Sequence, residues 1–260
     1  MQDRSLTCLG VGDGLPCADR NHSAYLYRLG PVTVLVDCGE GLSRSYKALG
    51  LSYELIDRIF LSHLHADHVG GFFMMLQSLW LEDRRKALTV HAPSEGLGPV
   101  RQMLRAGYLF DELLPFRLTF EPLAAGLPVR IGPVTVTPHL TTHLEDFRRQ
   151  FGSMYPVGFE AYSFVLEGVG ARIGHSADLG GVTDLEPLVA APLDLLVCEL
   201  SHFAVEELFG FLQGRRVRRL ALVHLARAYR DKVEQVRTLA SKMLPETSVC
   251  FPLDGEVIEL

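Results

Sequence analysis

One short stretch of the chain concentrates side chains that can bind a metal ion. In Ser62-His63-Leu64-His65-Ala66-Asp67-His68, three histidines and one aspartate follow an apolar run at 59–61. If the chain stays extended there, His63 and His65 point the same way, because the side-chain period of a strand is two. Neutral imidazoles and carboxylates are good ligands for a borderline cation such as zinc. The stretch therefore predicts a metal site at a strand end, and the alternative is a polar loop with chance histidines.

The elements that must position these residues follow from hydrophobic periodicity and turn residues. Strands are expected at 5–11, 23–29, 32–37, 58–61, 87–91, 134–138, 161–167, 171–174, 193–198, 219–223 and 248–252. Helices are expected at 43–49, 67–81, 98–107, 185–190, 205–213 and 231–244. Strands followed by strand–helix alternation, twice, predict an α/β protein of two sheets packed face to face with helices outside. No linker divides the chain, so we expect one domain over 1–260.

Composition narrows the class of protein. The chain has 260 residues, of which 48% are hydrophobic and 22% charged, and this is typical of a globular protein. Its 25 Lys and Arg residues against 31 Asp and Glu give a formal charge of −6, which disfavours a strongly basic nucleic-acid binder. No apolar run reaches the roughly 18–20 residues of a membrane helix, and no secretory signal is visible. Five cysteines without CxxC spacing favour reduced thiols and a cytoplasmic location.

The histidine-rich stretch resembles the signature of the metallo-β-lactamase superfamily. Other segments match that family in order: 34–41, which ends a strand in Asp37, then His143, Asp178 and His224. The resemblance covers roughly residues 5–225 and implies an αββα sandwich of two mixed β-sheets with a two-metal site on one edge. It implies that His63, His65 and His143 hold one metal, that Asp67, His68 and His224 hold the other, and that Asp178 bridges them.

Several of these assignments have an alternative. His139 lies four residues before His143 and is a rival third ligand, although the position after a strand favours His143. Alone, His224 is more often a satisfied histidine at a strand end, and its matching partners favour a ligand. His175 either lines the site as a substrate contact or caps a turn. Asp37 either orients the histidine-rich loop through hydrogen bonds or simply forms a turn.

The ligand set implies hydrolysis. Two zinc ions, with manganese or iron as alternatives, can lie about 3.5–4 Å apart, share a water and lower its pKa toward neutrality. The resulting bridging hydroxide would attack phosphorus or a carbonyl carbon, and the metals would hold the developing negative charge. None of these ligands is redox-active, and the complete motif differs from the carboxylate-substituted pattern of the family's di-iron oxygen reductases.

Two further segments are similar to ribonuclease Z, the transfer-RNA 3′-end endonuclease of this superfamily. They are 9–16 with the following Arg20-Asn21, and 194–199, where Cys198 replaces the histidine of the family's HEAT segment. The resemblance implies that Glu199 assists a proton-donating histidine, and the alternative is a surface carboxylate. The candidate catalytic residues are therefore Asp67, Glu199 and His202.

Other features depart from ribonuclease Z. Only 35 positions separate His143 from Asp178, too few for the arm that binds transfer RNA, and the family's HFSxRY motif has lost its serine at 224–229. An enzyme without an arm would need a basic surface, and the arginine cluster at 215–219 is either a phosphate contact or a solvated connection. We therefore predict a zinc-dependent phosphodiesterase that acts on a small-molecule or short phosphodiester substrate. We expect no membrane partner. A nucleic-acid substrate is possible but not favoured, and a homodimer is possible. The alternatives are a carboxylic ester, lactone or sulfate ester hydrolase, a transfer-RNA endonuclease, and a non-enzymatic metal-binding protein.

The segment after His143 has a pattern of its own. Phe147, Phe151, Tyr155 and Phe159 recur every four positions around Arg148 and Arg149. One interpretation is a short helix that packs its aromatics on the core or on a second subunit. The other is a lid over the metals with Arg148 or Arg149 facing the substrate, because loops at the rim of a site commonly set specificity and arginine suits phosphate.

Overall fold

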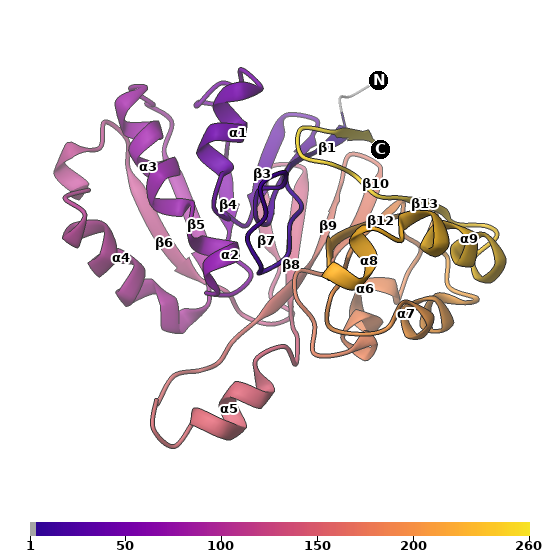
Figure 1. The fold of residues 1–260 in the computed structure, drawn as a ribbon. Helices are drawn as coiled ribbons and strands as arrows, with labels where there is room; N and C mark the ends of the chain where they lie inside the picture. The colour runs from indigo at the N-terminus through magenta and orange to yellow at the C-terminus, as the bar shows by residue number, and fades with distance from the viewer. Residues whose placement is uncertain (1–3) are drawn as a thin grey trace.

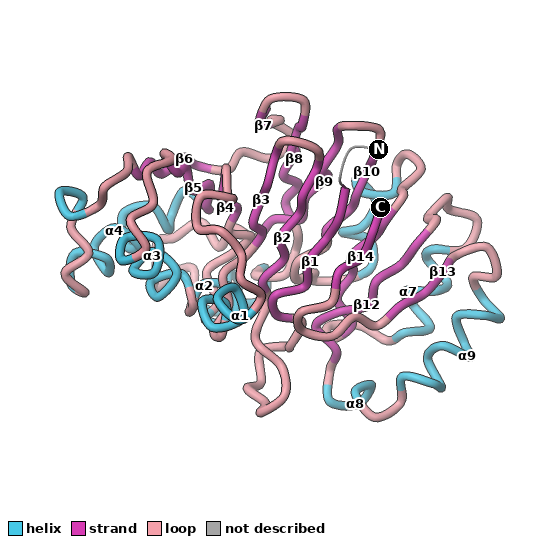
Figure 2. The backbone as a smooth tube through the Cα atoms, turned by 90° about the horizontal axis from the view of Figure 1, so that it is seen from above, coloured by secondary structure: helices cyan, strands magenta, loops and turns pink. Residues whose placement is uncertain are grey.

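Two seven-stranded sheets pack face to face in the computed structural model, which describes residues 4–260 (Figure 2). The first sheet has the strand order β14-β1-β2-β3-β4-β5-β6 and the second β13-β12-β11-β10-β9-β8-β7. The first consists of β14 (Val257–Glu259), β1 (Arg4–Gly10), β2 (Ala24–Leu29), β3 (Val32–Val36), β4 (Arg58–Phe60), β5 (Leu88–Ala92) and β6 (Leu118–Pro122). The second consists of β13 (Ser248–Cys250), β12 (Arg219–Leu225), β11 (Leu195–Leu200), β10 (Ala171–His175), β9 (Tyr162–Gly168), β8 (Val134–Leu140) and β7 (Val129–Ile131). The predicted sandwich of two mixed sheets is confirmed.

Helices cover the outer face of each sheet (Figure 1). Those of the first half are α1 (Leu42–Ala48), α2 (Ala66–Val69), α3 (Phe72–Leu81), η1 (Ser94–Gly96), α4 (Leu97–Ala106) and η2 (Asp111–Leu113). Those of the second half are α5 (Glu145–Phe151), η3 (Val182–Leu185), α6 (Glu186–Val189), α7 (Val205–Leu212), α8 (Arg227–Arg230) and α9 (Val233–Met243). Of these, α5 stands apart and projects away from both sheets (Figure 1). No helix within residues 4–260 is long and apolar enough to cross a membrane.

Three apolar layers hold the sandwich together. In β2, Tyr25 and Tyr27 face the core between the sheets, whereas Ala24 and Leu26 face the core under α1, α3 and α4. This alternation follows from the strand period of two. A third layer joins the second sheet to α6, α7 and α9. Because the central strands are buried on both faces, they are nearly continuous apolar runs in the sequence.

The parallel parts of the two sheets determine where polar residues collect. Strands β3, β4 and β5 run parallel in the first sheet, and β10, β11 and β12 run parallel in the second. The carboxyl ends of parallel strands share one edge, where ligands commonly bind in open sheets. The loops after β3, β4, β10, β11 and β12 therefore meet at one edge of the sandwich.

Several elements differ from the sequence-based expectation. The helix predicted at 67–81 is interrupted between α2 and α3, because Gly71 N donates its hydrogen bond to the carbonyl oxygen of Cys38 (2.8 Å) and not to the preceding helical turn. Strands β6, β7 and β14 were not predicted, because each is short, carries polar residues and is only partly buried. The five cysteines are free thiols, as expected.

Candidate metal centre

Seven ligand-type side chains meet at this edge from both sheets. His63 and His65 lie in the loop after β4, and Asp67 and His68 lie in the short helix α2 that follows it. From the second sheet come His143 after β8, Asp178 after β10 and His224 near the end of β12. They are the seven residues predicted as ligands, and the structure brings all of them together in two overlapping sets.

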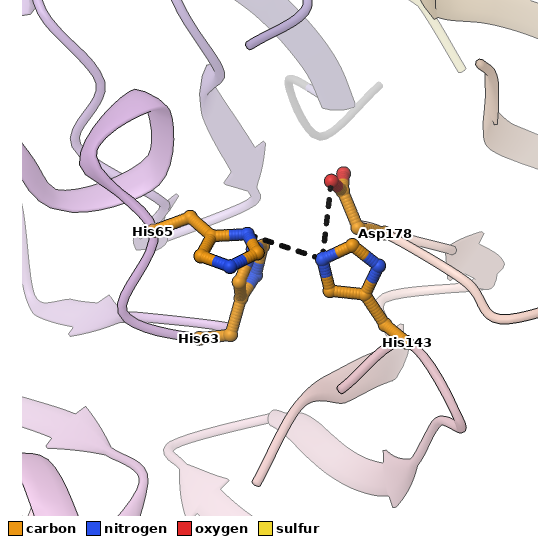
Figure 3. Close-up of side chains that lie close together, drawn as sticks. All are labelled: His63, His65, His143 and Asp178. Carbon is orange, nitrogen blue, oxygen red and sulfur yellow. Dashed lines mark hydrogen bonds and ion pairs between the residues drawn. The ribbon is translucent and has the colours of Figure 1, made fainter. Parts of the chain in front are cut away.

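The first set contains His63, His65, His143 and Asp178, whose ligand atoms all lie within 4.8 Å of one another. His65 Nδ1 lies 3.1 Å from His63 Nε2 and 3.2 Å from His143 Nε2. Asp178 Oδ2 lies 3.7 Å from His143 Nε2. Figure 3 shows the three imidazoles and the carboxylate converging on one space.

The second set contains Asp67, His68, Asp178 and His224, again with ligand atoms within 4.8 Å of one another. Asp67 Oδ2 lies 3.2 Å from His224 Nε2 and 3.4 Å from His68 Nε2. Asp178 Oδ1 lies 3.2 Å from His68 Nε2. Asp178 therefore belongs to both sets through its two oxygens, and each set takes two side chains from the first half of the chain and two from the second.

The polar atoms of this cluster fit cations. His68 Nε2 and Asp178 Oδ1 are buried and lie 3.2 Å apart, but neither makes a well-directed hydrogen bond to any described residue, although buried polar atoms are ordinarily paired. Burial lowers the pKa of His63 well below its usual value and that of His143 to about 4, so both rings are neutral, as a metal ligand must be. Burial raises the pKa of Asp178, but the nearby His224 and His68 lower it by a larger amount. The net pKa is well below its usual value, so the carboxylate is ionised.

Asp37 holds the histidine-rich loop in place through hydrogen bonds to Ser62 and His68. Its carboxylate is fully buried; Oδ1 accepts a hydrogen bond from Ser62 N (2.7 Å), and Oδ2 accepts one from Ser62 Oγ (2.8 Å). Oδ2 also lies 2.7 Å from His68 Nδ1. Because Nδ1 of His68 is held in this way, its Nε2 is directed at Asp178. Asp37 is thus placed to orient His68, although it belongs to neither ligand set itself.

A second histidine–carboxylate pair lies beside the ligands. Glu199 is buried, and its Oε1 lies 2.8 Å from His202 Nδ1. His202 Nε2 is 4.0 Å from Asp178 Oδ2, and the side chain is 34% exposed. Burial lowers the pKa of His202, but the hydrogen bond and charge of Glu199 outweigh that and raise it above the usual value. His202 is therefore protonated more readily than an ordinary histidine, and it lies at the edge of the cluster.

A cavity of about 710 Å³ opens over the cluster. Its walls include Asp13 and Gly14 from the loop after β1, His202, and Phe147 and Arg149 from α5. Arg148 does not line it, because its guanidinium donates a hydrogen bond to the carbonyl of Gly158 (2.8 Å). Only Arg149 of the predicted pair thus faces the cavity, and the segment predicted as a lid forms one wall of it.

His175 is not part of the cavity wall. It is 1% exposed, and its Nδ1 lies 2.8 Å from the hydroxyl of Tyr27 between the sheets. This position excludes the predicted contact between His175 and a substrate, because strand β10 turns the side chain inward. His139 lies outside both ligand sets.

Ser201 is a residue that sequence reasoning missed. Its Oγ donates a hydrogen bond to Glu199 Oε2 (2.9 Å) and lies 3.0 Å from His224 Nδ1. It therefore connects the carboxylate beside His202 to a ligand of the second set. A serine between Glu199 and His202 carries no spacing signal, and only the turn after β11 brings it to His224.

Known proteins resemble this chain in sequence and in fold. A model of the family described as anti-Pycsar protein Apyc1 matches residues 4–235. Ribonuclease Z from Bradyrhizobium diazoefficiens is 25% identical over 302 residues, which cover 98% of this chain and 99% of that protein. Among solved structures, the metallo-β-lactamase fold protein YhfI from Bacillus subtilis superposes over the whole of both chains with a TM-score of 0.75 at 20% identity. The short form of human tRNase Z covers 98% of each chain with a TM-score of 0.74 at 19% identity.

Proposed function

Because the chain belongs to the family of anti-Pycsar protein Apyc1 and is a ribonuclease Z-like member of the metallo-β-lactamase superfamily, we propose that it is a zinc-dependent phosphodiesterase. The observation that carries the proposal is the convergence of seven ligand-type side chains in two sets that share Asp178. The name of the relative, ribonuclease Z, supports phosphodiester chemistry over that of other hydrolases.

The ligands divide between two zinc ions. His63, His65 and His143 would hold one, Asp67, His68 and His224 would hold the other, and Asp178 would contact both. When bound, two such cations lower the pKa of a shared water and offset the negative charge that develops on the phosphoryl oxygens. The proposal needs no redox-active ligand.

Two side chains are placed to move protons. Asp67 lines the cavity, where its ionised carboxylate can accept a proton from the attacking water. On the opposite side, His202 directs Nε2 into the cavity while Glu199 holds its Nδ1. A protonated histidine in this position can donate to the leaving oxygen, and such a donor typically contributes about 10²- to 10⁴-fold in rate.

The cavity favours a small substrate. Its volume of about 710 Å³ lies within the range of sites that enclose one small molecule. Transfer-RNA 3′-end cleavage is the second candidate, favoured by the ribonuclease Z relative. Against it, the segment 144–160 has two arginines, three carboxylates and no lysine, whereas RNA binding depends on basic contacts to phosphate. We therefore expect weak or no cleavage of a precursor transfer RNA at physiological salt. Efficient cleavage would make transfer RNA, and not a small phosphodiester, the favoured substrate.

The decisive experiment combines metal content with turnover. Protein reconstituted with zinc should contain two zinc ions per chain and should hydrolyse bis-p-nitrophenyl phosphate. Asp178→Ala should lower the zinc content, and His65→Ala or Asp67→Ala should abolish hydrolysis. His139→Ala is the matched control, since His139 is a neighbouring histidine outside both sets, and it should retain metal and activity.

Two outcomes would refute the proposal. One is a zinc content near zero after reconstitution, and the other is equal activity in the wild type, His65→Ala and Asp67→Ala. Faster turnover of a carboxylic or sulfate ester than of any phosphodiester would assign the site to an ester hydrolase.

A further inference from the structure

The segment between His143 and β9 forms an arm that leaves the sandwich beside the metal centre (Figure 1). We define the arm as residues 144–158, which include α5. Met154, Tyr155 and Val157 within it are more than half exposed. None of the residues of α5 is buried. An arm with so little packing of its own must be held in place at its two ends.

Carboxylates fix both ends of the arm. At its start, Asp184 Oδ2 accepts hydrogen bonds from Thr142 N and Thr142 Oγ1, each 2.9 Å long. At its end, the carboxylate of Glu95 accepts from Phe159 N (2.9 Å) and Glu160 N (2.8 Å). Glu160 in turn accepts from Ser94 N (2.9 Å) and Ser94 Oγ (2.8 Å). The arm is therefore anchored to the body at both of its ends.

Phe147 is the arm residue closest to the metal ligands. Its ring lies 5.7 Å from the ring of His65 at an interplanar angle of 71°. It also stacks with Phe151 on the next turn of α5, at 6.0 Å. Phe147 nevertheless remains 45% exposed and lines the cavity. Of the described residues in the cavity wall, it is the one phenyl, phenol or indole ring.

We propose that Phe147 is a stacking platform that positions a planar aromatic group of the substrate while its phosphate is held at the metal centre. This inference rests on the proposed function, because the metal centre defines where the phosphate lies. Apart from its contacts with His65 and Phe151, the Phe147 ring stacks on no other aromatic ring of residues 4–260, and its remaining surface faces the cavity. Aromatic side chains bind flat ring systems, including nucleobases, through such a surface.

Binding measured without turnover tests the inference. The probes are adenosine 5′-monophosphate and ribose 5-phosphate, which share phosphate and sugar and differ in the base. Titration calorimetry with zinc-loaded protein should give a dissociation constant about 5- to 150-fold lower for the nucleotide, the range expected for one stacked base. Phe147→Leu should reduce this ratio to below twofold and leave the affinity for ribose 5-phosphate unchanged. Phe147→Trp should restore it.

Tyr155→Leu is the matched control, because Tyr155 is an aromatic residue of the same arm, 60% exposed, that does not line the cavity. It should keep the full preference for the nucleotide. Equal binding of both probes by the wild type would overturn the proposal. So would an equal loss for both probes, or a loss of zinc, in Phe147→Leu, since either shows a packing role. Because no hydrolysis is measured, a protein without phosphodiesterase activity would still answer this question.

Discussion

Replacement of Glu199 by glutamine separates a proton-donating role of His202 from a structural one. The carboxylate accepts five hydrogen bonds. Oε1 accepts from Leu179 N (2.9 Å) and lies 2.8 Å from His202 Nδ1, while Oε2 accepts from Ser201 N, Ser201 Oγ and His202 N at 2.8, 2.9 and 3.2 Å. A glutamine has one acceptor oxygen, so in either orientation its NH₂ group faces at least two of these donors.

The size of the effect follows from these contacts. Hydrogen bonds to a charged group contribute about 1.5–3 kcal/mol each, so the loss of two predicts a destabilisation of about 3 kcal/mol or more. Without the hydrogen bond and charge of Glu199, the pKa of His202 should fall, because burial lowers it and only the smaller effect of the Asp178 charge still raises it. The proton donor should be lost, and this would slow reactions that need it by about 10²-fold or more.

The assay compares two leaving groups on the same metal-loaded protein. p-Nitrophenolate leaves without a proton, whereas the alkoxide of a dinucleoside phosphate needs one. Glu199→Gln should reduce kcat about 100-fold for the dinucleoside phosphate and by less than about threefold for bis-p-nitrophenyl phosphate. His202→Asn should give the same pattern, and the double variant should be no worse than either single variant, because the two side chains act as one unit. Equal losses on both substrates would refute the reasoning, since they would indicate damage to the metal centre.

Three further predictions follow from contacts already described. Asp37→Asn should weaken zinc binding about 10- to 100-fold, because the amide cannot accept from Ser62 N, Ser62 Oγ and His68 at once; a zinc-chelator competition titration measures this, and unchanged affinity would contradict it. Arg149→Ala should raise KM for a phosphodiester several-fold while Arg148→Ala, which alters a residue turned away from the cavity, should not; equal effects in steady-state kinetics would remove the distinction. Burial, and then the charge of Arg58, lower the pKa of His91 from 6.5 to about 4. Between these pH values His91 is protonated in the unfolded chain and neutral in the folded chain. Stability should therefore fall as the pH drops from about 6.5 to 4, by about 3 kcal/mol in total, and urea unfolding should show a smaller pH dependence in His91→Leu.

The sequence was informative where a local pattern was sufficient. Four candidate ligands lie within the short stretch 63–68, where residue types and spacing were enough to select them. His143, Asp178 and His224 were selected by the resemblance to the metallo-β-lactamase superfamily, because a single histidine or aspartate after an apolar run is not specific on its own. The sandwich of two sheets followed from the order of strands and helices and is confirmed. These features depend on the period of the backbone, which the sequence expresses directly.

Properties that depend on helical phase or on a turn were not predictable. Arg148 and Arg149 are adjacent in the sequence, and only the orientation of α5 places one in the cavity wall and turns the other to Gly158. His175 is one residue from the loop that carries Asp178, yet as the last residue of β10 it points between the sheets. Ser201 meets His224 through a turn after β11, a contact 23 positions apart that no spacing rule describes.

Each ligand set takes half of its side chains from either half of the chain, and this has a consequence for folding. Each cation would take two side chains from the amino-terminal half of the chain and two from the carboxyl-terminal half. It would thus add a cross-link to halves that already meet at this edge through hydrogen bonds, such as those from Tyr162 N to the carbonyl of Ser62 (3.0 Å) and from His224 N to the carbonyl of Val11 (2.9 Å). Ligand binding to the folded state adds about 2.7 kcal/mol per site when free metal is 100 times the dissociation constant. Metal availability would therefore change the free energy of unfolding of the chain as well as its chemistry. A chelated protein should exchange its amide hydrogens fastest at the open edge, while strands at the far end of the sandwich stay protected.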